Sequence, residues 1–276
     1  MSIARAAYTA VIYALVPRAL AHLAWRGRRE PAYREHIAER FGYFADARPA
    51  DPLIWIHAVS VGETRGAEPL VHALAARYPD HRILLTHMTP TGRRTGEALF
   101  GDRVMRCYLP YDYPAAVARF LDHYRPRLGL LMETEIWPNL IDACRDRTVP
   151  IYLVNARLSE KSFRRYHRFA RLAREALSAL TGVAAQTAED AQRLTALGAR
   201  SVAVTGNLKF DVTPPGALSA LGRELRVRYG ERPVLLAAST RDGEEDLLLD
   251  VLDSIAELRH YRRHMAALVD GASKPS

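Results

Sequence analysis

Residues 53–87 read LIWIHAVSVGETRGAEPLVHALAARYPDHRILLTH. The stretch opens and closes with short apolar runs, Leu53–His57 and Arg82–His87, and Ala67–Arg77 between them has the spacing of an amphipathic helix. Continuously apolar runs are typical of strands that are buried on both faces of a parallel sheet. Two such strands joined through a helix form a βαβ unit with a right-handed crossover. The stretch therefore predicts the start of a doubly wound α/β domain.

The same alternation of strand and helix patterns continues to about residue 210. Further strands are expected at Val104–Tyr108, Leu128–Met132, Pro150–Val154, Val183–Gln186 and Val202–Thr205. Further helices are expected at Arg93–Leu99, Pro114–His123, Trp137–Asp146, Ser159–Leu180 and Ala188–Leu197. We therefore predict a complete Rossmann-like domain at residues 31–212.

A proline-containing linker, DVTPPGALSA at residues 211–220, follows this domain. A helix to about Gly230, a strand at Pro233–Ala238 and a helix starting near Glu244 then predict the opening of a second α/β domain at residues 213–252. The tail at residues 253–276 resumes no strand pattern. Because one clear strand cannot build a parallel sheet, we expect this chain to lack most of its second domain.

Composition limits the class of protein. The chain has 276 residues, 49% of them hydrophobic and 25% charged, which is typical of a globular protein and excludes wholesale disorder. A net charge of +8 favours anionic partners in general but does not select nucleic acid among them. The two cysteines, Cys107 and Cys144, cannot form a disulfide framework and have no metal-ligand spacing, so a reducing, cytoplasmic compartment is expected.

The N-terminal segment, residues 1–30, combines apolar and basic residues. Residues 6–17 (AAYTAVIYALVP) carry no charge, but this run is shorter than the roughly 20 apolar residues that a spanning helix needs. A basic cluster follows at residues 26–29, and the small-residue cleavage pattern of a signal peptide is missing. The segment is either an interfacial anchor that faces anionic lipid or a core-packing helix with solvated arginines.

Two loops at the predicted carboxyl ends of strands carry acidic residues, and ligands of open α/β sheets bind at this edge. HAVSVGE, residues 57–63, places Glu63 at the start of a helix, where it is either a functional carboxylate or a residue that stabilises the helix N-terminus. METEIWPN, residues 132–139, carries Glu133 and Glu135. Both point to one face if the strand persists through Glu135, and only Glu133 is directed by the sheet if the strand ends there. A lone acid at such an end is rarely needed for packing, which favours a functional role for Glu133.

Basic residues occupy two further places. Lys209 follows a tight turn in TGNLKFD, residues 205–211, where it is either a cation that holds a carboxylate or phosphate or a solvated surface lysine. Residues 161–175 form a basic amphipathic helix that either binds an anionic surface or covers the sheet with a solvated face. The loops contain no HExxH, CxxC, GxSxG or GxGxxG motif, which disfavours a metalloprotease, a nucleophile-elbow hydrolase and a standard NAD enzyme.

Six ordered motifs resemble one family. HAVSVGE, THMTPTG, YLPYD, METEIWPN, NARLS and TGNLKFD closely resemble the Kdo (3-deoxy-D-manno-octulosonic acid) transferases of lipopolysaccharide synthesis, and the resemblance runs to about Leu252. It implies a GT-B architecture of two Rossmann-like domains, with the acceptor bound mainly by the first and the CMP-Kdo donor by the second. It also implies a location on the cytoplasmic side of the cell inner membrane, an anionic membrane surface as a partner, and no nucleic-acid partner.

The resemblance assigns roles to three residues. It implies that Glu63 is the proton acceptor and that Glu133 and Lys209 stabilise the transition state of an inverting transfer of Kdo to a lipid A precursor, lipid IVA. A carboxylate can accept the proton of the attacking hydroxyl, and a cation can offset charge on the leaving group. The family implies neither a metal nor another cofactor.

The chain also departs from the family. The CMP-binding motifs of the second domain, a Pro-Arg-His-Pro segment, a glycine-rich loop and an Asn-Pro-x-Glu helix start, are absent. We therefore expect this chain to show little or no transfer and poor solubility. The alternative is a non-catalytic, membrane-associated module that binds acidic lipid.

Overall fold

The structure is a computed structural model that describes residues 2–211, 216–231 and 236–254. Contacts between residues divide the chain into two units, Met1–Thr213 and Pro214–Ser276. The boundaries expected from the sequence stay a prediction, and each unit is described by itself.

The first unit is built on one parallel sheet of seven strands in the order β3-β2-β1-β4-β5-β6-β7. The strands are β1 (Leu53–His57), β2 (Arg82–His87), β3 (Met105–Tyr108), β4 (Leu128–Met132), β5 (Ile151–Ala156), β6 (Gly182–Ala185) and β7 (Val202–Val204). The chain builds outward from β1 to β3 and then returns to place β4 on the other side of β1. The direction in which successive strands are added to the sheet therefore reverses between β1 and β4. Ligand sites of such folds lie at this switch point.

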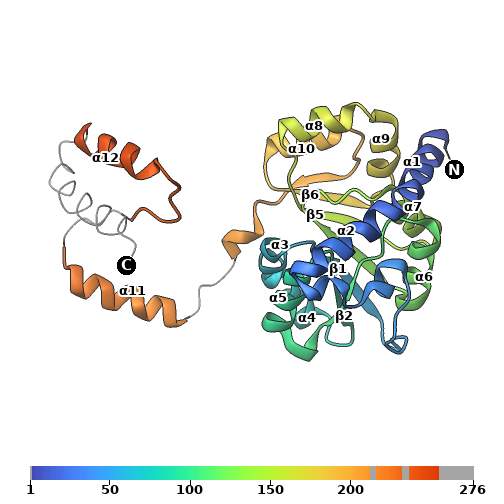
Figure 1. Cartoon of the computed structure of the whole chain (residues 1–276), viewed down its shortest axis with the longest axis horizontal. Coiled ribbons are helices and arrows are strands. Elements are labelled where there is room, and N and C mark those ends of the chain that lie inside the picture. The colour runs from blue at the N-terminus through green and yellow to red at the C-terminus, as the bar shows by residue number, and fades with distance from the viewer. Residues whose placement is uncertain (1, 212–215, 232–235, 255–276) are drawn as a thin grey trace. The chain divides into compact units, whose positions relative to one another are not determined.

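Helices cover both faces of the sheet (Figure 1). The main helices of the first unit after the N-terminal segment are α3 (Val61–Gly66), α4 (Glu68–Arg77), α5 (Pro90–Phe100), α6 (Pro114–Tyr124), α7 (Pro138–Asp146), α8 (Glu160–His167), α9 (Ala170–Ser178) and α10 (Ala188–Ala196). Side chains of α6, α7, α9 and α10 share one buried cluster, and side chains of α4 and α5 belong to another. The two clusters lie on opposite faces of the sheet, as expected for a doubly wound domain.

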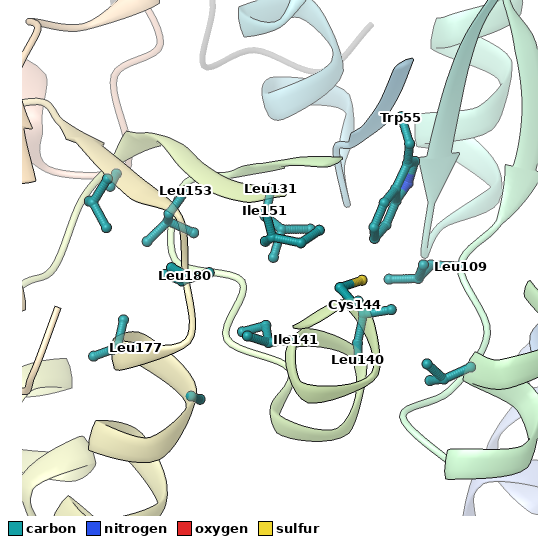
Figure 2. Packing of buried hydrophobic residues seen from close by; sticks show 14 of the residues in the cluster. Trp55, Leu109, Leu131, Leu140, Ile141, Cys144, Ile151, Leu153, Leu177 and Leu180 are labelled. Atoms are coloured by element: carbon teal, nitrogen blue, oxygen red, sulfur yellow. The ribbon is translucent and has the colours of Figure 1, made fainter. Parts of the chain in front are cut away.

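The larger cluster joins the middle of the sheet to α7. Leu131, Ile151 and Leu153 of the sheet face Leu140 and Ile141 of α7 (Figure 2), and none of these side chains is more than 2% exposed. Alternate residues of each strand supply the two faces, because successive side chains of a strand point to opposite sides. This packing fixes the carboxyl ends of β1 and β4, from which the candidate site is built.

All seven strands predicted for the first domain are present, with ends that differ by at most two residues. The prediction of one helix over Ser159–Leu180 is wrong, because α8 ends at His167 and α9 begins at Ala170. At the break, the N–H groups of Arg168 and Phe169 donate to carbonyls three residues back, as in a 3₁₀ turn. No glycine or proline marks this break in the sequence. The short helix α3 begins at Val61, before the helix predicted at Ala67–Arg77, and Glu63 stands at a helix start as expected.

Two helices form the N-terminal segment, α1 (Ile3–Ala14) and α2 (Val16–Arg29). Polar side chains attach α1 to the domain: Tyr8 donates to Asp112, Thr9 donates to Asn139, and Arg5 pairs with Asp142 of α7. No residue of α1 is fully buried. Within the described residues, no single helix has the length and hydropathy to cross a membrane, whereas α1 and α2 pass that test together as a pair bent by 42°.

In the second unit the structure describes two helices, α11 (Gly216–Tyr229) and α12 (Glu244–Ser254). Both correspond to helices expected from the sequence. The strand predicted at Pro233–Ala238 falls mostly on residues outside the described ranges, and residues 236–238 have no regular structure. The tail predicted at residues 253–276 lies almost entirely outside them.

Gly129 of β4 sits where a side chain would collide with its neighbours. A Cβ atom there would overlap Cδ1 of Ile151 and lie 2.8 Å from Cε3 of Trp55. We expect Gly129→Ala to lower the free energy of unfolding by about 1–3 kcal/mol, because overpacked cores shift backbone and rotamers. Urea unfolding followed by tryptophan fluorescence measures this loss. Gly66→Ala is the control, because a Cβ there has no neighbour within 4 Å and is expected to leave the protein as stable or more stable.

Candidate functional site

The candidate site lies at the carboxyl ends of β1 and β4, the two neighbouring strands at the switch point of the sheet. Glu63 comes from the loop and helix after β1, and Glu133 directly follows β4. The structure therefore brings two of the predicted residues to one edge of the sheet. Their charges interact, because Glu133 is one of the groups that raise the pKa of Glu63.

Glu63 lies in the first turn of α3, and its carboxylate is held from two sides. Oε2 accepts a hydrogen bond of 2.8 Å from the backbone N–H of Val59, and Oε1 accepts one of 2.9 Å from the hydroxyl of Ser60. Ser60 is also the N-cap of α3, since its Oγ accepts from the N–H of Glu63. The arrangement resembles a capping box, so the sequence S-V-G-E explains the local geometry.

The pKa of Glu63 is nevertheless raised to about 7. Burial is the largest cause, because it disfavours the charged form, and the nearby Glu135 and Glu133 add like-charge repulsion. The hydrogen bonds from Val59 and Ser60 act in the opposite direction but do not cancel the effect of burial. A carboxyl group with a pKa near 7 exchanges a proton readily at neutral pH, as a general base must.

Two buried histidines support the loop that carries Glu63. Nδ1 of His87 lies 2.9 Å from the carbonyl oxygen of Ala58, and Nδ1 of His57 lies 2.9 Å from Oγ1 of Thr86. Burial lowers the pKa of His57 to about 3 and that of His87 to about 4, so both rings are neutral at pH 7. His87 therefore supports the start of the loop at Ala58, His57 links β1 to β2, and neither ring adds charge beside Glu63.

Glu133 occupies a strained position at the end of β4. Its φ of 55° is left-handed, which is uncommon for a residue other than glycine, while its N–H still donates to the carbonyl of Val154. Strained backbone of this kind often marks functional sites. The strand ends at Met132, before both glutamates, so neither of the two strand ends considered from the sequence, Glu133 and Glu135, is the observed one. A turn orients Glu133 instead.

Glu135 belongs to the same acidic group. Its Oε2 accepts a hydrogen bond of 2.8 Å from the indole N–H of Trp137, and burial together with Glu133 raises its pKa. Three carboxyl groups are thus gathered at this edge of the sheet. Among the residues that the structure describes, no group of three or more His, Cys, Asp or Glu side chains is arranged to hold a metal ion.

Lys209 lies in η4 (Leu208–Asp211), which contacts α4, the helix after α3. Its side chain is exposed, and its N–H donates to Oδ1 of Asn207. Asn207 in turn donates to Gln186, and Oδ1 of the buried Asn155 accepts from the N–H of Leu208 at 3.1 Å. Amides from the ends of β5 and β6 therefore fix the turn before Lys209. Asn155 has a φ of 52°, a second left-handed residue at this edge.

The comparisons with known proteins bear on this site. Residues 35–212, which contain all three predicted site residues, match the model of a family described as 3-deoxy-D-manno-octulosonic-acid transferase (kdotransferase). The chain belongs to this family. The resemblance found in the six motifs is therefore confirmed.

Relatives in this family cover most of the chain. The 3-deoxy-D-manno-octulosonic acid transferase of Bordetella pertussis is 46% identical over 258 residues, which cover 88% of this chain and 59% of that protein. The Haemophilus influenzae transferase is 37% identical over 88% of this chain and 58% of its own length. A probable mitochondrial transferase of Arabidopsis thaliana is 33% identical over 91% of this chain and 58% of its own length. The chain thus spans somewhat less than three fifths of these relatives.

A solved structure supports the fold. UDP-GlcNAc 2-epimerase from Neisseria meningitidis aligns with a TM-score of 0.50 at 12% sequence identity, over 75% of this chain and 63% of the epimerase. At this identity the likeness shows the fold alone. The expected α/β fold of GT-B type is confirmed.

No role was predicted from the sequence for two residues that shape the site of this Kdo transferase family member. Asp112 is buried and accepts from the backbone of α7, and Trp137 donates to Glu135. Asp112 and Asn155 stand in the motifs YLPYD and NARLS. Asp112 lies four residues after β3 and Asn155 lies within β5, so their places in these motifs were the available signal. The contacts that give these residues their roles come from distant parts of the chain.

Replacing Ser60 tests how a hydrogen bond sets the pKa of Glu63. We expect Ser60→Ala to raise the pKa of Glu63 further, by about one pH unit, because a hydrogen bond to the charged carboxylate is lost. NMR titration of the side-chain carboxyl carbons measures the shift. Ser159→Ala is the matched control, because Ser159 caps α8 without a hydrogen bond to a described carboxylate. An unchanged pKa in Ser60→Ala would show that this hydrogen bond does not control Glu63.

Proposed function

We propose that this chain acts in a glycosyltransferase that moves Kdo from CMP-Kdo to a lipid A precursor, lipid IVA, during lipopolysaccharide synthesis. The observation that carries the proposal is the carboxyl group of Glu63, which lies at the switch point of the sheet with a pKa of about 7. Membership of the Kdo transferase family supports it. In this proposal the first unit binds the acceptor.

Glu63 accepts the proton of the acceptor sugar in this reaction. The acceptor hydroxyl attacks the anomeric carbon of Kdo, its proton passes to Glu63, and the bond from that carbon to the CMP phosphate breaks, with inversion. Because its pKa is near 7, a large fraction of Glu63 is deprotonated at neutral pH and still basic enough to accept the proton. Lys209 offsets negative charge on the leaving group. Glu133 stabilises the transition state from the strained turn after β4.

In this proposal the reaction takes place at the cytoplasmic side of the inner membrane, and the surface of the N-terminal helices supports that location. Ile3, Val11 and Leu15 leave 80%, 56% and 45% of their surface exposed, and α2 ends with three arginines in its last turn. An exposed apolar helix face followed by basic residues suits an interface with anionic lipid. The polar contacts of α1 with the domain leave this apolar face outward.

The test is transfer of labelled Kdo from CMP-Kdo, generated in situ, onto a tetra-acylated lipid A precursor. The chain is assayed as it is and as a chimera, in which residues 1–212 replace the corresponding part of the Bordetella pertussis relative. We expect the chimera to transfer Kdo and its Glu63→Gln variant to lose transfer. A well-folded chimera that binds the acceptor without transferring Kdo would instead favour a non-catalytic lipid-binding module.

A further inference from the structure

A pocket of about 580 Å³ lies between α1 and the α8–α9 break, outside the acidic group described above. Its walls are mostly apolar: Ala4, Ala7 and Val11 from α1, and Phe169, Leu172 and Ala173 from the start of α9. This volume falls within the range of small-molecule pockets, about 300–1,000 Å³. An apolar ligand is favoured here, because a polar one would lose hydration without compensating hydrogen bonds.

One end of this pocket approaches the acidic group. Ile136, which lines the pocket, directly follows Glu135 in the chain. Tyr166 also lines the pocket, and the charge of Glu135 raises its pKa. The pocket and the acidic group are therefore near each other in the fold.

The mouth of the pocket combines an exposed aromatic ring with positive charge. Phe169 is 65% exposed and lies at the break between α8 and α9. Arg168 and Arg171, both exposed, flank it and also line the pocket. Local patterning placed these residues inside one continuous helix. The local sequence favours a continuous helix, but the structure interrupts it here. Such conflicts between local sequence preference and structure are expected at functional or strained sites.

The geometry points to a binding site for one saturated acyl chain of an anionic lipid, which is the acceptor of the proposed reaction. The chain occupies the pocket between α1 and α9, and Arg168 pairs with a phosphate of the headgroup at the mouth. This inference rests on the proposed function for the identity of the lipid, and on the pocket itself for the chemistry of the ligand.

Charge and location favour this occupant over others. A second copy of this chain would bring like charges together, because α8 and α9 carry Arg164, Arg165, Arg168, Arg171 and Arg174. The pocket is open to the surface, because Ala7, Val11 and Phe169 in its lining are exposed, so the experiment must separate a single lipid chain from a bilayer surface. A single chain attached to an anionic headgroup matches both the apolar walls and the basic mouth.

The experiment uses the 276-residue chain and dodecyl phosphate, below its critical micelle concentration, as the probe. Isothermal titration calorimetry gives the affinity. We expect Ala7→Trp, which fills the pocket from α1, to weaken binding at least tenfold. Ala10→Trp is the matched control, because Ala10 is an exposed alanine of the same helix outside the pocket, and it is expected to change the affinity less than twofold.

A second variant tests the mouth. Arg168→Gln is expected to weaken dodecyl phosphate binding by about three- to tenfold and to leave dodecyl maltoside binding unchanged, because only the phosphate is charged. Equal losses for both probes would overturn the role of Arg168. Dodecyl phosphate binding that Ala7→Trp does not weaken would overturn the pocket as the site.

Other occupants give different results. Binding to anionic vesicles without binding of monomeric dodecyl phosphate would mean that this face contacts the bilayer, which overturns the inference. Self-association that Ala7→Trp abolishes, measured by sedimentation, would mean that a second copy fills the pocket. Failure of the proposed function is distinguishable, because it abolishes Kdo transfer while alkyl phosphate binding, which does not involve Glu63, persists.

Discussion

Replacing Glu63 by glutamine is expected to lower Kdo transfer by the chimera by about 10²–10⁴-fold, the range over which a general base contributes to rate. Glutamine has nearly the same shape. Its amide oxygen can accept from the N–H of Val59 and its NH2 group can donate to Oγ of Ser60, so the loop keeps its support. It cannot accept a proton at neutral pH. Initial rates at saturating acceptor measure the loss.

The pH profile of the unmodified site separates a catalytic from a structural role. Glu63 must be deprotonated to act as a base, so below a pH of about 7 the rate is expected to fall about tenfold per pH unit, and above it to level off. Glu68→Gln, in the first turn of α4, is the control and is expected to keep both the rate and the profile. A Glu63→Gln variant with a near-normal rate would show that Glu63 only caps α3.

The fold could be predicted because buried parallel strands have a simple local pattern. LIWIH and RILLTH contain the continuous apolar runs LIWI and ILL, and each is followed by a loop. The order of the strands in the sheet could not be predicted from this local pattern, because the return of the chain from β3 to β4 depends on packing across the sheet. The position of the site at the carboxyl ends of the strands followed from the general rule for doubly wound sheets.

The geometry of the site could be predicted only in part. The sequence placed Glu63 at the start of a helix, and the S-V-G-E spacing supports that position. It could not show that the pKa of Glu63 is raised. Burial depends on the packing of the whole domain, and the neighbours Glu133 and Glu135, which also raise this pKa, lie about seventy residues further along the chain. The left-handed backbone of Glu133 and the break before Phe169 also carry no local signal, because neither involves glycine or proline.

Replacing Asp112 by alanine is expected to cause the largest loss of stability. Its Oδ1 accepts from the N–H of Leu140 at 2.8 Å, and its Oδ2 accepts from the N–H of Asn139 and from the hydroxyl of Tyr8. Asp112 thus joins the first turn of α7 to α1. Because alanine leaves buried N–H groups without an acceptor, we expect the free energy of unfolding to fall by about 2–5 kcal/mol. Urea unfolding followed by tryptophan fluorescence measures it.

The pH dependence of this loss identifies Asp112 as its source. Burial raises the pKa of Asp112 in the folded state to about 7, above the ordinary value of 3.8. The folded state therefore binds the proton more tightly, and the stability that this group contributes is complete below pH 3.8 and is lost as the pH rises through 7. The difference between the unmodified protein and Asp112→Ala is thus expected to be larger at pH 5 than at pH 8, by about 2–3 kcal/mol. Asp122→Ala removes an exposed partner of Arg147 and is expected to cost less than about 1 kcal/mol at either pH. A loss from Asp112→Ala that is equal at both pH values would show that Asp112 is charged in the folded protein throughout this range.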